Sequence, residues 1–169
     1  RDAIAVSSCS DTQKSVAATD TAAACTVMRR ALYLIDHHTH HLKQLFSKSI
    51  ALSEYFKNEA FYQDRLRRRV KACNDNRINL HCVGLCATKS ERVAYVLETL
   101  GFMHTTINLC DEFFSSDPHY RISTMVHEFG RLEGINRDEG WNTSDIFLWD
   151  GIFRTLGDLQ NYQYIVNMP

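Results

Sequence analysis

Six cysteines restrict the folds open to this chain more than any other feature of its sequence. In a small domain from an oxidising compartment, an even set of cysteines favours three disulfides. The six are Cys9, Cys25, Cys73, Cys82, Cys86 and Cys110. Cys82 and Cys86 could instead form half of a zinc ribbon, but the sequence has no matching second pair. The sequence therefore predicts a disulfide-bonded protein, while the cysteine count alone leaves the pairing open.

Composition narrows the class of protein further. The chain has 169 residues, of which 44% are hydrophobic, so it can bury the core of one domain, and we expect a single domain over 1–169. The net charge of −1 gives no electrostatic reason to expect a nucleic-acid or membrane partner. No apolar run approaches the roughly 20 residues that cross a bilayer. Because Arg1 has no apolar leader before it, we expect a mature secreted, extracellular protein. We also expect a monomer.

Hydrophobic spacing divides the chain into three parts. Residues 10–73 have helical periodicity, with Ser10 or Asp11 as the first N-cap and the first helix ending near Tyr33. Residues 80–134 contain short β-branched or apolar runs at 80–85 and 105–109 and then one more helix, whereas 93–97 could be strand or helix. Residues 135–169 form a closing part with two helical pieces. We expect an α+β fold, mainly α-helical, with a small and mostly antiparallel sheet.

A basic cluster lies near the end of the N-terminal part. Arginines occupy positions 65, 67, 68 and 69, and Lys71 follows. We interpret this cluster as the solvated face of an amphipathic helix, with an acidic partner as the alternative.

The segment Thr124–Arg131 carries a truncated zinc-protease motif. In H-E-x-x-H, two histidines one helical turn apart bind Zn²⁺ and the glutamate activates the metal-bound water. Here His127 and Glu128 are present, but Arg131 occupies the place of the second histidine. An arginine is always protonated and has no lone pair for a metal. The apolar stripe of this helix, which consists of Ile122, Met125, Val126, Phe129 and Leu132, sets the motif residues on an adjoining face.

A second group of histidines follows the first predicted helix. Residues 36–41 read Asp-His-His-Thr-His-His and include His37, His38, His40 and His41. If the segment is helical, His37 pairs with His41 and Asp36 with His40 at a spacing of four residues, and either pair could hold a divalent cation. The alternative is a solvated helix end, because two imidazoles bind metal weakly without a third ligand and a fixed second shell.

Several ordered segments around the motif resemble the deuterolysin family, or aspzincins, of secreted fungal zinc endopeptidases. The segments are Ser53–Lys57, Arg65–Val70, the Cys82 and Cys86 pair, Ile107–Asp111 and Asn161–Tyr164. The resemblance covers the chain from Cys9 to about Val166 and implies a zincin-like, deuterolysin-type domain. It also implies disulfides between Cys9 and Cys82 and between Cys86 and Cys110, which leaves Cys25 to pair with Cys73.

The same resemblance implies the roles of the site residues. Carried over to this chain, His127 is the first zinc ligand, Glu128 the general base and Asp145 the third ligand, with Asp138 the next candidate. The segment around Asp145 departs from the family pattern at Asn142, Leu148 and Trp149. A catalytic zinc usually needs three protein ligands and a water. At ~4 Å, the Arg131 guanidinium and Zn²⁺ would repel by roughly 8 kcal/mol at an effective dielectric of 20.

We therefore expect no zinc at the motif and no other cofactor. In this hypothesis Arg131 takes the electrostatic place of the metal by pairing with Glu128 or Asp145. Asn142 begins an N-glycosylation sequon, which places that segment on the surface of a secreted protein.

The expected function is that of a secreted pseudoprotease that binds a host or extracellular protein. Deuterolysin-like proteins occur among the virulence effectors of plant-pathogenic fungi, and the sequence leaves open whether this one acts outside or inside a host cell. One alternative is an active zinc endopeptidase that uses His119 or the histidines from 37 to 41 as a substitute ligand. The other is a metal-binding protein that uses His37 to His41.

Overall fold

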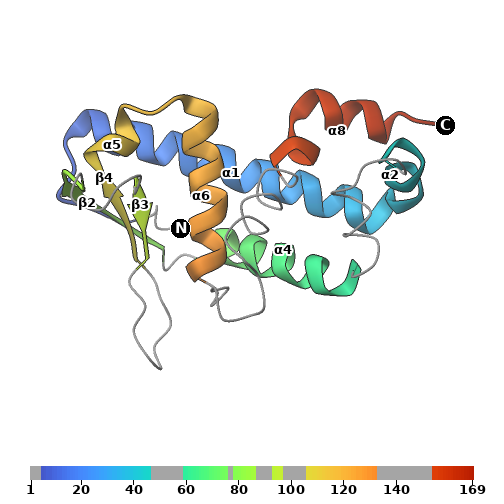
Figure 1. Ribbon diagram of the computed structural model, residues 1–169, viewed down its shortest axis with the longest axis horizontal. Helices are drawn as coiled ribbons and strands as arrows, with labels where there is room; N and C mark the ends of the chain where they lie inside the picture. Colours follow the sequence, from blue (N-terminus) through green and yellow to red (C-terminus); the bar gives the residue numbers. More distant parts are fainter. Residues whose placement is uncertain (1–4, 47–58, 76–77, 87–92, 97–105, 133–153) are drawn as a thin grey trace.

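A long helix, α1 (Asp11–His37), runs through the molecule and contacts most of the other helices (Figure 1). The computed structural model describes residues 5–46, 59–75, 78–86, 93–96, 106–132 and 154–169. The predicted N-cap is Ser10: its hydroxyl accepts the Gln13 N–H at 3.1 Å, and the Gln13 side chain accepts the Ser10 N–H at 3.0 Å. This capping box fixes where α1 begins. The helix continues to His37, beyond its predicted end at Tyr33.

Five further helices accompany α1 in the described part of the chain. They are α2 (Thr39–Phe46), α4 (Glu59–Asn74), the short α5 (Asp111–Phe114), α6 (Pro118–Leu132) and α8 (Leu159–Val166). A helical turn at 154–157 precedes α8. The mainly helical fold predicted from periodicity is confirmed. The Ser53–Lys57 segment of the resemblance and Gly134, the predicted end of α6, lie outside the described residues.

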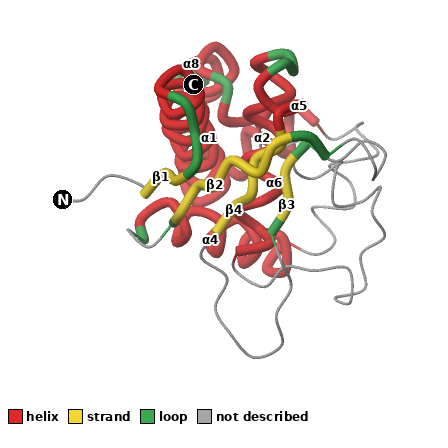
Figure 2. Tube along the Cα trace, turned by 90° about the vertical axis from the view of Figure 1, so that its left-hand side faces the viewer, coloured by secondary structure: helices red, strands yellow, loops and turns green. Residues whose placement is uncertain are grey.

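The four described strands form one small sheet at one end of α1 (Figures 1 and 2). They are β1 (Ala5–Ser7), β2 (Asn79–Gly84), β3 (Ala94–Tyr95) and β4 (Thr106–Cys110), in the order β1-β2-β4-β3. The pairs β1–β2 and β2–β4 are parallel, and only β3–β4 is antiparallel. The sheet is therefore mixed, and the prediction of a mostly antiparallel sheet is wrong for these strands.

Long connections explain the strand directions. Parallel neighbours need a crossover, and α1, α2 and α4 lie between β1 and β2 in the chain, so β1 and β2 can run in the same direction. The undecided stretch 93–97 supplies the edge strand β3. Strand β1 was not predicted, because three residues are too few to show a period of two.

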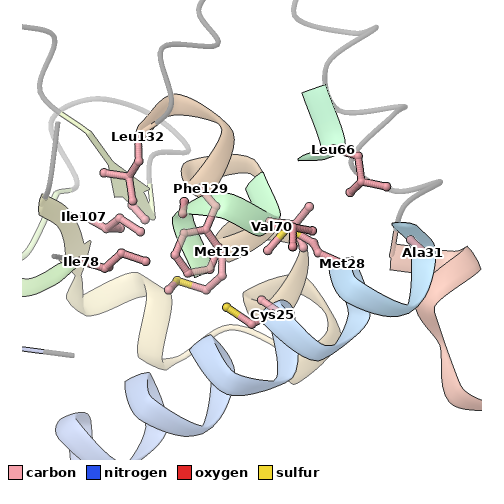
Figure 3. Packing of buried hydrophobic residues seen from close by; sticks show 14 of the residues in the cluster. Cys25, Met28, Ala31, Leu66, Val70, Ile78, Ile107, Met125, Phe129 and Leu132 are labelled. Atoms are coloured by element: carbon pink, nitrogen blue, oxygen red, sulfur yellow. The ribbon is translucent and has the colours of Figure 1, made fainter. Parts of the chain in front are cut away.

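The hydrophobic core lies where α1, α4 and α6 meet the sheet. Figure 3 shows Met28 of α1, Val70 of α4, Met125 and Phe129 of α6, and Ile107 of β4 packing together. The predicted apolar stripe of the motif helix is confirmed, since Met125, Val126 and Phe129 are fully buried. This packing holds α6 against both the helices and the sheet.

Three disulfides connect these elements, and they are the three pairs expected above. Cys9–Cys82 joins the segment before α1 to β2, Cys25–Cys73 joins α1 to α4, and Cys86–Cys110 joins the end of β2 to the end of β4. Each one closes a long loop, which in the chain-entropy description stabilises by about 3–4 kcal/mol. Among the described residues, no helix has the length and apolar character needed to span a membrane.

An ion pair ties the start of α6 to α1. The Arg121 Nε donates to Asp20 Oδ2 at 2.7 Å, and its Nη1 donates to the Ser116 carbonyl at 2.7 Å. Both side chains are largely buried, with 15% and 6% of their surface exposed. Removing one partner of such a pair leaves an uncompensated charge and typically costs about 3–5 kcal/mol.

We predict that Gly157→Ala destabilises the protein by about 2–3 kcal/mol. A Cβ at Gly157 would lie 1.9 Å from the Val27 carbonyl oxygen of α1, so the backbone of 154–166 must move away from α1. The free energy of unfolding in urea measures this loss. Gly130→Ala is the matched control, because its added Cβ would meet the Arg69 side chain at 3.0 Å and no foreign backbone. Equal losses in the two variants would contradict the prediction.

Candidate functional site

Helix α6 holds the motif residues in the arrangement that the sequence predicts. His127 and Arg131 are four residues apart in one unbroken helix, so they lie one turn apart on the same side. Both are half-buried, and Glu128 is 4% exposed. A buried carboxylate beside a partly accessible histidine and arginine is an arrangement suited to binding or proton transfer.

A buried arginine from α4 lies directly beneath the motif. Arg69 has no exposed surface and is among the largest fully buried side chains in the described part of the chain. Its Nε donates to the Val126 carbonyl at 3.2 Å, one residue before His127, and its Nη1 donates to the Arg65 carbonyl at 3.3 Å. These bonds give the desolvated guanidinium backbone acceptors on both helices.

Gly130 makes this contact sterically feasible. A Cβ at position 130 would lie 3.0 Å from Cζ, Nε and Nη2 of Arg69, which is tighter than an ordinary van der Waals contact. The glycine inside the motif helix therefore lets a guanidinium pack against the α6 backbone. In the sequence, the only sign of this close contact between Arg69 and the α6 backbone is a glycine inside a predicted helix.

The interpretation of the basic cluster as a solvated face is wrong for two of its members. Arg69 is fully buried, and Arg65 is 8% exposed. Arg67 and Lys71 are exposed, as predicted. The composition of α4 does not reveal which arginines are buried. An arginine can extend its long apolar stem into the interior and donate hydrogen bonds to carbonyls there.

The third ligand position cannot be placed beside the motif. Asp145, Asp138 and Asn142 lie outside the described residues. The hypothesis that Arg131 pairs with Glu128 or Asp145 therefore stays a prediction.

The substitute zinc ligands named above lie far from His127. His119 precedes it by about two turns of α6 and is rotated by about 80° around the helix axis, so the two rings do not converge on one ion. Helix α6 contacts α1 at Asp20, which accepts a hydrogen bond from Arg121. His37 lies 17 residues further along α1, which is about 25 Å along the helix axis. Figure 1 accordingly shows α2 at the opposite end of α1 from the sheet, with α6 crossing α1 between them.

The histidines at the α1–α2 junction pair differently from the helical prediction. Helix α1 ends at His37, and His38 has φ −131° and ψ 28°, which interrupts the helix before α2 begins at Thr39. The His38 and His41 Nδ1 atoms then lie 3.4 Å apart. The condition for pairing at a spacing of four residues, one helix running through the whole segment, is therefore not met.

Three neighbouring residues contact this junction. The buried His41 has its Nε2 3.0 Å from the Pro169 backbone oxygen, and Asp36 accepts two N–H groups of Arg67 rather than facing His40. The Tyr33 ring packs against His37 and His38 at centroid distances of 4.6 Å and 5.8 Å. Desolvation, followed by repulsion from His41, His37 and His40, lowers the pKa of His38 from its ordinary value.

One other group of potential metal ligands occurs in the described part of the chain. It consists of Cys86, Cys110 and Glu112. The two sulfurs are joined in a disulfide and offer no thiolate, and the Glu112 carboxylate accepts the Cys86 N–H at 3.0 Å and 3.2 Å. This group is therefore a structural clamp.

Comparisons with known proteins found no match, either among family models or among curated proteins. The assignment to the deuterolysin family accordingly rests on the ordered segments quoted above and is taken up below as a proposal.

We predict that the effect of Gly130→Ala depends on residue 69. In the parent, the gain in helix propensity, about 0.5–1 kcal/mol, is offset by displacement of the Arg69 guanidinium. In an Arg69→Met background that obstacle is gone, so Gly130→Ala should stabilise by that amount. A double-mutant cycle of urea unfolding measures the difference. The same change in both backgrounds would show that Arg69 and Gly130 do not constrain each other.

Proposed function

We propose that this chain is a secreted pseudoprotease of deuterolysin type that acts by binding another protein. The observation that carries the proposal is the presence of Arg131 one helical turn after His127, where a second imidazole would have to complete a zinc site. A guanidinium cannot coordinate Zn²⁺ and repels it. The chain keeps the helix and the glutamate of the motif without its ligand set.

The disulfides and the unbroken motif helix support the deuterolysin-type assignment. The disulfides Cys9–Cys82 and Cys86–Cys110 are those that the resemblance implies, and extracellular small proteins commonly depend on such bonds. We further propose that the bound protein is a host protein and that this chain is a fungal effector. This part of the proposal rests on the resemblance alone.

The residues of α6 fit a binding role. His127 and Arg131 are partly accessible, and the accessible part of a guanidinium can pair with a carboxylate of a partner. Arg69 binds the middle of α6, and the Asp20–Arg121 pair binds its N-terminal turn. The backbone that carries His127 and Arg131 is therefore fixed in position. A prearranged surface of this kind lowers the entropic cost of binding.

We expect Arg131→His to restore zinc binding at the motif. Purified chains are analysed for retained zinc after dialysis, with His38→Gln in every chain so that the histidines of the α1–α2 junction do not contribute. The variant should retain more zinc than its parent, since it regains the second imidazole. Arg131→Gln is the matched control: it removes the charge without adding a ligand, and it should gain none.

Casein hydrolysis is assayed with the unsubstituted chain as parent and with its Glu128→Ala variant. The parent and its Glu128→Ala variant should be equally inactive. Chelator-sensitive hydrolysis by the parent that Glu128→Ala abolishes would overturn the proposal in favour of an active endopeptidase. Equal zinc in parent and Arg131→His would overturn the argument from the missing ligand.

A further inference from the structure

We propose a metal site at the α1–α2 junction, formed by the Nδ1 atoms of His38 and His41, for a divalent cation that prefers imidazole. These two nitrogens lie 3.4 Å apart. A tetrahedral Zn²⁺ with Zn–N bonds of about 2.0–2.1 Å holds two ligand nitrogens about 3.3–3.4 Å apart. The two Nδ1 atoms therefore already have the separation that one ion requires. The ring planes lie 20° apart with centroids at 5.6 Å, so binding turns the rings until both lone pairs face the ion.

The second nitrogen of His41 supports this assignment. Its Nε2 lies 3.0 Å from the Pro169 backbone oxygen, which can only accept, so Nε2 carries the proton and Nδ1 of the neutral ring carries the lone pair. Metal-binding histidines usually donate their other N–H to a carbonyl or carboxylate, which fixes the ring and its tautomer. His41 is also 5% exposed, so packing restrains its orientation.

The metal-free contact has a simple chemical description. With the His41 Nδ1 as acceptor, the His38 Nδ1 is the donor of the 3.4 Å contact. When an ion binds, the His38 proton moves to its Nε2 and the Nδ1 lone pair faces the metal. No proton is lost in this exchange, because both tautomers are neutral.

The neighbouring residues leave room for the remaining ligands. His37 and His40 are exposed on either side, and water can complete the coordination. The His40 ring lies against His41, with centroids 3.8 Å apart. Imidazole ligands select Zn²⁺, Cu²⁺ or Ni²⁺ over Mg²⁺ and Ca²⁺. The site is independent of the proposed function, because it lies at the α2 end of α1, whereas α6, which carries His127, crosses α1 nearer the sheet (Figure 1).

Zinc titration of the whole chain by calorimetry tests the site. The parent should bind about one Zn²⁺ per chain, and His38→Gln should weaken binding by at least about tenfold, since it removes one of two imidazole ligands. His119→Gln is the matched control at an exposed histidine of α6, and its affinity should equal that of the parent.

Imidazole ¹⁵N spectra of the unmodified chain provide a readout that needs no variant. Zinc should shift the Nδ1 resonances of His38 and His41 and leave those of His119 in place. No zinc binding by the parent, or equal affinity in parent and His38→Gln, would overturn the site. Zinc that shifts His127 and is lost in His127→Gln would instead place the ion at the motif, and would count against the proposed function as well.

Discussion

The burial of one guanidinium between α4 and α6 is the constraint on which the site depends. Arg69 has no exposed surface, so it needs acceptors in the interior, and it finds one in the Val126 carbonyl of α6. The contact is close because Gly130 has no side chain. Two other specific contacts complete the frame: Cys25–Cys73 joins α1 to α4, and Asp20–Arg121 joins α1 to α6. Each pair among the three central helices therefore has its own link.

These contacts explain how α6 keeps its position if, as proposed, the motif binds no zinc. In a small domain, a structural metal can supply much of the folding free energy. Here α6 is held by apolar packing, an ion pair and a buried arginine, so its position does not require an ion at His127. Replacing a ligand with Arg131 would then change the chemistry of the surface while leaving its backbone intact. The same independence lets the α1–α2 junction be considered as a separate site.

Local patterns predicted most of the elements. The N-cap at Ser10 or Asp11, the β-branched or apolar runs near 80 and 106, and the apolar stripe of α6 all correspond to observed features. Each depends on residues within one or two turns or along a single strand. Strand direction was mispredicted, since it depends on where long helical connections return the chain. The burial of Arg69 was missed because composition does not distinguish a solvated arginine from one whose acceptors belong to another helix.

For the candidate site, the sequence by itself determined which chemical groups are present: His127, Glu128 and Arg131 at helical spacing, and a cluster of histidines after α1. It determined this because spacing along a helix fixes which side chains share a face. Only the tertiary structure decided which groups meet. The helix break at His38 and the contact with Pro169 select His38 and His41 as the close pair, and the approach of α4 to Gly130 places Arg69 beneath the motif. The physical reason is that these contacts join residues far apart in the chain, or depend on a single backbone angle that periodicity does not reveal.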